Sequence, residues 1–245
     1  MANINKANRQ VCDVDIRVLK TMEPFLFFDT ANTTTAGFSA EDTYAKAKGA
    51  NKIAFTNPME GTMTIEAQVA PFKLYALLSD GTIETSAVIA KKETVKCETA
   101  GSLTLPAGAK AGTVFVYAAG DFAGTEIKGT YSGDKFTATT ADEIAVGSSY
   151  EVGYLVSKSE GVQKIAFNNK RNPLDYYITM NTVEKDESGV LTPYIITAYK
   201  AKPQKSLDLS FSSEGDPASV TITFSVLEDK DGNVIDMVEL EDEAE

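Results

Sequence analysis

Short runs in which apolar and polar residues alternate dominate the chain, and Gly, Pro, Asn and Asp residues separate these runs. A period of two residues is typical of antiparallel strands that bury one face, whereas amphipathic helices repeat every 3.6 residues. The segment after the turn NPMEG shows the pattern well, with Met63, Ile65, Ala67 and Val69 facing one way and Thr62, Thr64, Glu66 and Gln68 the other. We therefore predict a mainly β protein, built as an antiparallel β-sandwich or barrel.

The most regular alternation lies late in the chain, between residues 206 and 226. One face is apolar: Leu207, Leu209, Phe211, Val220, Ile222, Phe224 and Val226. The other face carries Asp208, Ser210, Ser212, Thr221, Thr223 and Ser225. The sequence SEGDPAS between the two halves predicts a hairpin turn. The pattern alone fits an ordinary solvent-facing sheet or, if copies pair edge to edge in a ring, the wall of a conduit.

Two segments interrupt the strands and predict short helices. Residues 71–81, PFKLYALLSDG, have Pro71 at a permitted first position, an apolar stripe and Gly81 as a stop. Residues 38–49, FSAEDTYAKAKG, offer Ser39 as an N-cap and Gly49 as a stop, although their apolar face is mostly alanine. We expect the first helix to pack its apolar stripe on the back of the sheet.

The composition of the sequence changes in the middle of the chain, where Gly, Ala and Thr become frequent and short segments with strand-like alternation recur every 8 to 12 residues. This spacing favours a small β-sandwich in its own right. We predict a small β-sandwich domain at residues 96–161, inserted into one larger domain. That domain is formed by residues 1–95 and 162–245, with an N-terminal arm over residues 1–50.

Composition and charge exclude several classes of protein. The 245 residues are 43% hydrophobic and carry a net charge of −12, with no cluster of Lys and Arg that could hold nucleic acid tightly. No apolar run approaches the roughly 18 residues that a membrane span needs. Cys12 and Cys97 have no metal-site spacing, and we expect two buried free thiols. The N-terminal sequence MANINKANRQ shows no export signal, so we expect a cytoplasmic protein.

Candidate catalytic chemistry is sparse. Without histidine, Ser-His, Cys-His and His-metal sites are excluded, and only a two-carboxylate hydrolase stays open. The segment EDKDGNVID superficially resembles a calcium loop, but Val234 stands where that loop requires glycine, so Asp231-Gly232 is better interpreted as a hairpin turn. We predict no enzyme activity, no cofactor and no metal site.

The aromatic run EPFLFFDT at residues 23–30 predicts a segment that is covered from both sides. Phe25, Phe27 and Phe28 place rings on both faces of any strand. Packing within the chain explains this, and so does a neighbouring subunit, which makes the three rings candidate interface residues.

Two segments together resemble the tail tube, or major tail, protein of tailed bacteriophages. They are FTNPMEGTMTIEAQVAPFKLYALLSDG, at 55–81, and YKAKPQKSLDLSFSSEGDPASVTITFSVLED, at 199–229. The resemblance implies a subunit that forms hexameric rings stacked into a tube. Such a tube encloses a tape-measure protein and later lets DNA pass, and sheath, baseplate or terminator proteins are further partners. Its place would be the virion tail, assembled in the host cytoplasm.

On that reading each region has an expected role. The residues expected to line the bore are Asp208, Ser210, Ser212, Thr221, Thr223 and Ser225. The N-terminal arm would reach the next subunit or ring. The insertion, which resembles the Ig-like additions of phage structural proteins, would decorate the outside. The rival interpretation is a monomeric Ig-like adhesin or carbohydrate-binding module, for which the texture of residues 96–161 is the best support.

Overall fold

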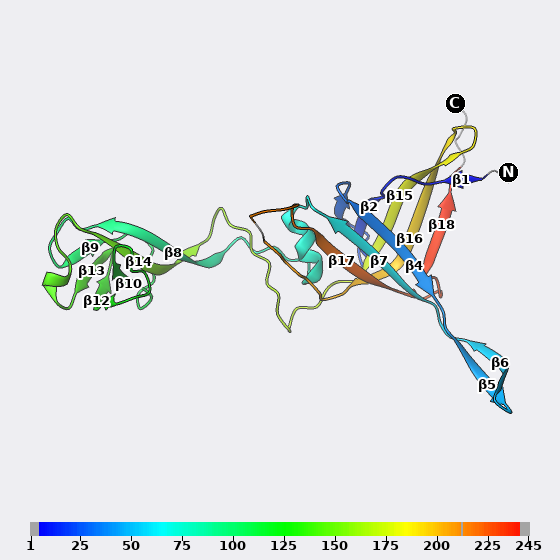
Figure 1. Ribbon diagram of the computed structural model, residues 1–245, viewed down its shortest axis with the longest axis horizontal. Helices are drawn as coiled ribbons and strands as arrows, with labels where there is room; N and C mark the ends of the chain where they lie inside the picture. The colour runs from blue at the N-terminus through cyan, green and yellow to red at the C-terminus, as the bar shows by residue number, and fades with distance from the viewer. Residues whose placement is uncertain (1–4, 212, 241–245) are drawn as a thin grey trace. The chain divides into compact units, whose positions relative to one another are not determined.

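The computed structural model describes residues 5–211 and 213–240 and divides into two compact units. The first unit consists of Met1–Thr82 and Ile165–Glu245, and the second of Ile83–Lys164 (Figure 1). Both are built almost entirely of antiparallel strands, as the alternation predicts. The predicted insertion covers 96–161, whereas the compact unit also includes β8 (Ala87–Lys96), which the sequence pattern left in the flanking segment.

One nine-stranded sheet forms the first unit. Its main order is β3-β2-β15-β16-β17-β7-β4, with β1 paired to β15 and β18 paired to β16. The strands are β1 (Lys6–Ala7), β2 (Asp13–Val18), β3 (Pro24–Phe28), β4 (Thr33–Ser39), β7 (Glu60–Ala67), β15 (Tyr176–Asp186), β16 (Leu191–Pro203), β17 (Val220–Leu227) and β18 (Ile235–Glu239).

The long strand β16 divides this sheet into two layers. Its residues 194–198 pair with β18, while only 200–203 pair with β17. β17 therefore separates from the rest of β16, and β7 and β4, which follow β17 in the sheet order, belong to the same layer as β17. Residues of β7 and β17 then share one apolar cluster with residues of β2 and β15. The sheet therefore folds over its own core in the manner of a β-sandwich, which agrees with the predicted fold class.

The helix predicted after Pro71 closes this core. It forms as the 3₁₀ helix η1 (Phe72–Leu78), whose Leu74, Ala76 and Leu77 are almost fully buried. The turn ends as expected at Gly81, whose φ of 76° lies in the left-handed region that favours glycine. The apolar stripe packs on the strands as predicted, although the winding is 3₁₀ rather than α.

The second predicted helix, at residues 38–49, is wrong. These residues finish β4 and form β5 (Asp42–Ala47), which pairs with β6 (Ala50–Thr56) in a separate hairpin. Lys48 and Gly49 both have positive φ, 51° and 81°, as a two-residue type I′ turn requires. Gly49, which was expected to end a helix, is thus the second residue of a hairpin turn.

The predicted pairing within residues 206–226 is also wrong for the described residues. β17 pairs with β16 and β7, while residues 206–211 belong to no strand. Ser212 lies outside the described residues. The expected hairpin turn after β17 needs the same correction. Asp229 accepts backbone hydrogen bonds from Asp231 and Asn233 in a tight turn, but β18 then runs beside β16 rather than back along β17.

The second unit has its own core between two small sheets. One has the order β11-β10-β14-β8 and the other β12-β13-β9. Besides β8, the elements are β9 (Ser102–Thr104), β10 (Phe115–Ala118), β11 (Glu126–Ile127), β12 (Gly129–Ser132), β13 (Lys135–Ala138), the turn η2 (Ala141–Glu143) and β14 (Ser149–Lys158). Val116, Ile144 and Val152 are fully buried between the sheets. This unit therefore has the apolar interior that an independently folding domain needs.

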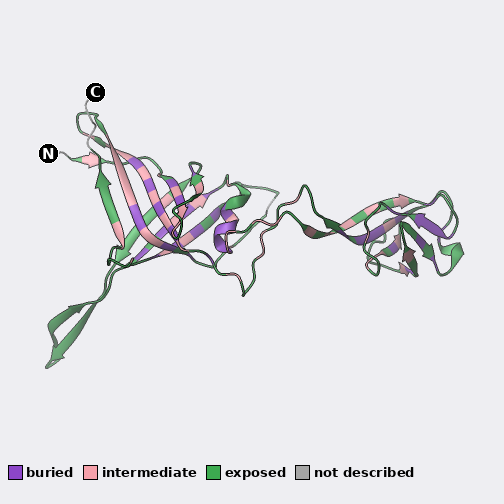
Figure 2. Cartoon of the chain, turned by 180° about the vertical axis from the view of Figure 1, so that it is seen from behind, coloured by how far each residue is buried: buried purple, intermediate pink, exposed green. Residues whose placement is uncertain are grey.

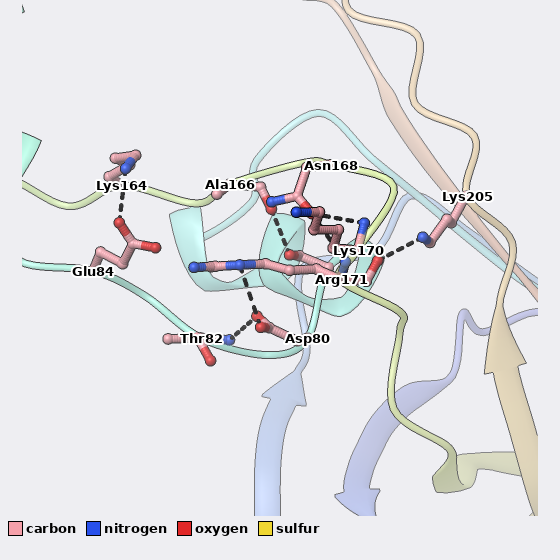
Figure 3. A network of polar contacts seen from close by, with 10 residues as sticks. Asp80, Thr82, Glu84, Lys164, Ala166, Asn168, Lys170, Arg171 and Lys205 are labelled. Carbon is pink, nitrogen blue, oxygen red and sulfur yellow. Dashed lines mark hydrogen bonds and ion pairs between the residues drawn. The ribbon is translucent and has the colours of Figure 1, made fainter.

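Polar contacts hold the chain where each unit begins and ends (Figure 3). In the first unit, Ser79 Oγ donates to the carbonyl of Ala166 at 2.7 Å, and Arg171 Nε lies 3.5 Å from Asp80 Oδ2. Burial opposes ionisation of Asp80, but hydrogen bonds from Thr82 and the charge of Arg171 together hold its pKa below the usual value. In the second unit, Glu84 and Lys164 exchange two backbone hydrogen bonds of 2.8 Å, so its two chain ends lie side by side.

Candidate functional site

Three neighbouring strands, β4, β7 and β17, present a surface of small polar side chains. Their registers align Thr35, Thr64 and Thr223 in one row, with similar rows on either side. We call this surface the hydroxyl face, made of Thr33, Thr35, Gly37, Thr62, Thr64, Glu66, Thr221, Thr223 and Ser225. These residues are exposed or half-buried.

The opposite side of β7 and β17 is dry, which fixes the orientation of the hydroxyl face on these two strands. Met63, Ile222 and Phe224 have no exposed surface, and Ile65 is 1% exposed. A slip of one residue in either strand would bring these side chains into water and the threonines into the core. The alternating purple and lighter bands on the strands in Figure 2 show this arrangement.

The hydroxyl face is a hydrated surface with few groups that could bind a nucleic acid or another polymer. Thr64 Oγ1 and Thr223 Oγ1 are 3.2 Å apart and hydrogen-bond to each other, and Gln204 Nε2 donates to Ser225 Oγ at 3.1 Å. Glu66 is the charged member of the set. None of its nine residues is a lysine or arginine that could grip phosphate, or an aromatic residue on which a base could stack. Lys202 of β16, the register partner of Ser225, is an exposed cation at the edge of the face. A polymer could slide along it without being retained.

Of the six predicted bore-lining residues, Ser212 lies outside the described residues and the other five fall into two groups. Thr221, Thr223 and Ser225 lie on the hydroxyl face. Asp208 and Ser210 lie outside any strand but line a hollow of about 420 Å³ together with Thr221 and Thr223. The sequence prediction missed β4, although TTTAGFS alternates. Its core side is Thr34, Ala36 and Phe38, and the contrast between the two sides is weak.

The three candidate interface rings differ in their surroundings. Phe28 is 1% exposed in the core of the first unit. Phe25 is half-buried against Tyr176, with ring centroids 5.4 Å apart, and Lys73 Nζ lies 4.7 Å from its centroid. Phe27 is 59% exposed and is the ring that a neighbour could contact.

The hairpin β5–β6 is exposed along its whole length (Figure 2). Ile53 and Phe55 are each 57% exposed and lie on one face of the hairpin, across from Ala45 and Thr43. Two strands alone are at best marginally stable in water. An exposed apolar face on such a hairpin is a candidate interaction surface.

Features of metal sites and membrane proteins can be assessed for residues 5–211 and 213–240. There, no three or more acidic or cysteine side chains gather in a way that could hold a metal ion. Within the same residues, no helix is both long and apolar enough to cross a membrane.

Hydrogen bonds from Asn233 and Asp231 lower the pKa of Asp229, which is consistent with its role as the acceptor of a turn.

Comparison with known proteins agrees with the resemblance carried by residues 55–81 and 199–229. No curated protein sequence matches the chain significantly. A family profile, in contrast, matches residues 9–239, which cover both segments of the first unit and the whole of the second. This match supports a structural protein of the phage tail tube. The chain belongs to the YomU/Tube protein family.

Proposed function

We propose that six copies of this chain form a ring, and that stacked rings form the tube of a phage tail. The tube would enclose a tape-measure protein and then conduct the genome, and it would assemble in the host cytoplasm before becoming part of the virion. The observation that carries this proposal is the hydroxyl face, which is three strands wide, is backed by a packed core at β7 and β17, and has no lysine, arginine or aromatic residue among its own members.

A conduit wall needs these properties. DNA that passes through a narrow bore must not be held by Lys or Arg side chains or stack on aromatic side chains of the wall, because each such contact slows its movement. The face must also keep its shape, and the buried side of β7 and β17 provides that rigidity. Carboxylates such as Glu66 would repel phosphate rather than hold it.

The exposed hairpin β5–β6 supports stacking. Its apolar face is available to a second copy, and the lysines near its turn, Lys46, Lys48 and Lys52, are drawn to a chain whose net charge is −12. In the assembly the hairpin would lie against the next ring. β5 is the last part of the N-terminal arm (residues 1–50), to which the sequence analysis gave the role of reaching the next subunit or ring.

The proposal is tested by purifying the full chain and concentrating it. Light scattering should report assemblies of six copies or multiples of six, and negative-stain images should show rings or tubes with a central channel. A chain that stays monomeric at every concentration, with no rings in the images, would contradict the proposal.

A second candidate function, a monomeric carbohydrate-binding module, draws on the second unit. Phe115 and Phe122 are 44% and 41% exposed, and Lys92 Nζ lies 4.5 Å from the Phe122 centroid. Tyr117 packs against Phe122 with centroids 5.2 Å apart. Aromatic rings held in this way can receive a sugar ring. The same light-scattering experiment separates the two functions, because this candidate requires a monomer.

A further inference from the structure

The hydroxyl face ends at two open sides within the chain. On one side, β4 pairs only with β7 among the described residues, so the outer backbone groups of β4 have no strand partner. On the other side, β17 pairs with β16 only through its last residues, from Phe224 to Leu227. Open edges of this kind recruit another strand.

A free segment with the period of a strand lies beside the second of these sides. Residues 206–211, SLDLSF, alternate polar and apolar side chains but belong to no strand. They run antiparallel to β17, since the N–H of Gln204 bonds to the carbonyl of Thr223 while Ser210 and Ser219 line the same hollow. Leu209 is 51% and Phe211 89% exposed, so their apolar side is uncovered.

The core side of β4 is uncovered as well. Ala36 is exposed, and Phe38, across from Gly61, is 53% exposed although it lies on the same side as Met63. A strand added beyond β4 would cover these residues with its own apolar side chains. Its polar side chains would extend the hydroxyl face.

We propose that β4 of one copy pairs with residues 206–211 of the next copy, so that the hydroxyl faces join into one continuous wall. This inference rests on the proposed function and names the seam between subunits. Asp208 and Ser210 would then face the bore beside Thr33, Thr35 and Gly37. Leu209 and Phe211 would cover Ala36 and Phe38, while Leu207 stays packed against the core of its own unit.

The partner is a second copy because one chain cannot make this contact with itself. β7 and β17 stand between β4 and the segment, and each strand adds about 4.8 Å to the distance between them. The donor and the acceptor are different surfaces, so the contact is head to tail and generates a ring when the rotation closes. β4 runs parallel to β17, because both are antiparallel to β7, so the segment would join a neighbouring β4 in antiparallel pairing.

Disulfide trapping in the full chain tests this seam. Thr35→Cys on one chain is mixed with Ser206→Cys, Asp208→Cys or Ser210→Cys on another, because these positions share one face and span the possible registers. Residues opposite each other on paired strands lie within disulfide reach. The parent chain, which retains Cys12 and Cys97, gives the background. Thr35→Cys mixed with Ser157→Cys, at an exposed position of β14, is the matched control.

We expect a covalent dimer from at least one mixture after oxidation, and none from either variant alone or from the control. Both substitutions on one chain should give a ladder that ends at the closed ring. Rings in negative-stain images without any cross-link would overturn the seam but not the proposed function. So would a dimer of Thr35→Cys alone, which indicates β4 against β4, or a cross-link confined to one chain. Absence of rings altogether would overturn the proposed function instead.

Discussion

Phe224 and Thr223 are adjacent in β17 but point to opposite sides of the sheet. Phe224 is fully buried in the core of the first unit, whereas Thr223 lies half-buried on the hydroxyl face. Phe224→Ala should lower the free energy of unfolding by about 3–5 kcal/mol, because it leaves a cavity in a packed core. Thr223→Ala, the matched control, should change it by no more than about 1 kcal/mol.

Denaturant unfolding followed by circular dichroism measures both variants. Because the two units have separate cores, the Phe224→Ala effect should appear only in the transition of the first unit. Equal losses from the two substitutions would mean that the orientation of β17 is incorrect.

Tyr154 gives the second unit a dependence on alkaline pH. Burial, together with a hydrogen bond from its phenol to Glu93, raises the pKa of Tyr154 to about 12. The unfolded value is about 10, so the neutral phenol stabilises the folded state fully below pH of about 10. That contribution is lost as the pH rises toward 12.

Thermal unfolding at pH 9 and at pH 11.5 tests this expectation. The second unit of the parent chain should lose more stability between these values than that of Tyr154→Phe, which has no phenol to ionise. Tyr44→Phe, on the exposed hairpin, serves as the control and should behave like the parent. An unchanged pH dependence in Tyr154→Phe would refute the assignment.

The hairpin β5–β6 should matter for assembly and not for folding. Ile53→Asp with Phe55→Asp changes two exposed side chains, so unfolding of the subunit should stay as in the parent. The same variant should form few or no long tubes, because charged side chains would have to be buried between rings. Negative-stain measurement of tube length gives the result.

Ala54→Asp is the matched control for this hairpin. It lies on the opposite face, across from Tyr44, and should leave tube length nearly unchanged. Tubes of normal length from the Ile53 and Phe55 variant would show that this face of the hairpin is not a stacking surface.

The accuracy of the sequence predictions follows from what each element buries. β7 and β17 were predictable because each has one face in the core, so Met63, Ile65, Ile222 and Phe224 alternate with polar residues. The hairpin β5–β6 is exposed on all sides. Its alanines, followed by Gly49 at the turn, form a sequence that is also typical of a helix ending in glycine. β5 buries neither face, so its sequence DTYAKA needs no apolar alternation to form a strand.

Residues 206–211 illustrate a different limit. They alternate as a strand does, but alternation identifies the two faces of a strand and not its partner. The sequence therefore placed Asp208 and Ser210 on the same surface as Thr221 and Thr223, and it could not show that β17 pairs with β7 rather than with this segment. The role of these side chains in a bore stays a prediction.

The two units of the molecule should be separable. Each has its own apolar core, and the bridge between Glu84 and Lys164 brings the two ends of the second unit together. Replacing residues 85–163 by a short glycine linker should leave the first unit folded and able to form tubes with the same bore. Residues 83–164 alone should fold as well.

Circular dichroism and thermal unfolding of the two pieces, with negative-stain images of the shortened chain, check this expectation. Each piece should reproduce one transition of the full chain. Loss of folding in the shortened chain would mean that the first unit depends on the second.

The most direct test of the account is a cryo-electron microscopy reconstruction of the assembled protein at a resolution that shows side chains. We predict a hollow tube of stacked rings, each of six subunits. Thr64, Thr223 and their neighbours on the hydroxyl face should point into the channel. A tube whose channel is lined by other strands, with these threonines on its outer surface, would contradict the central claim.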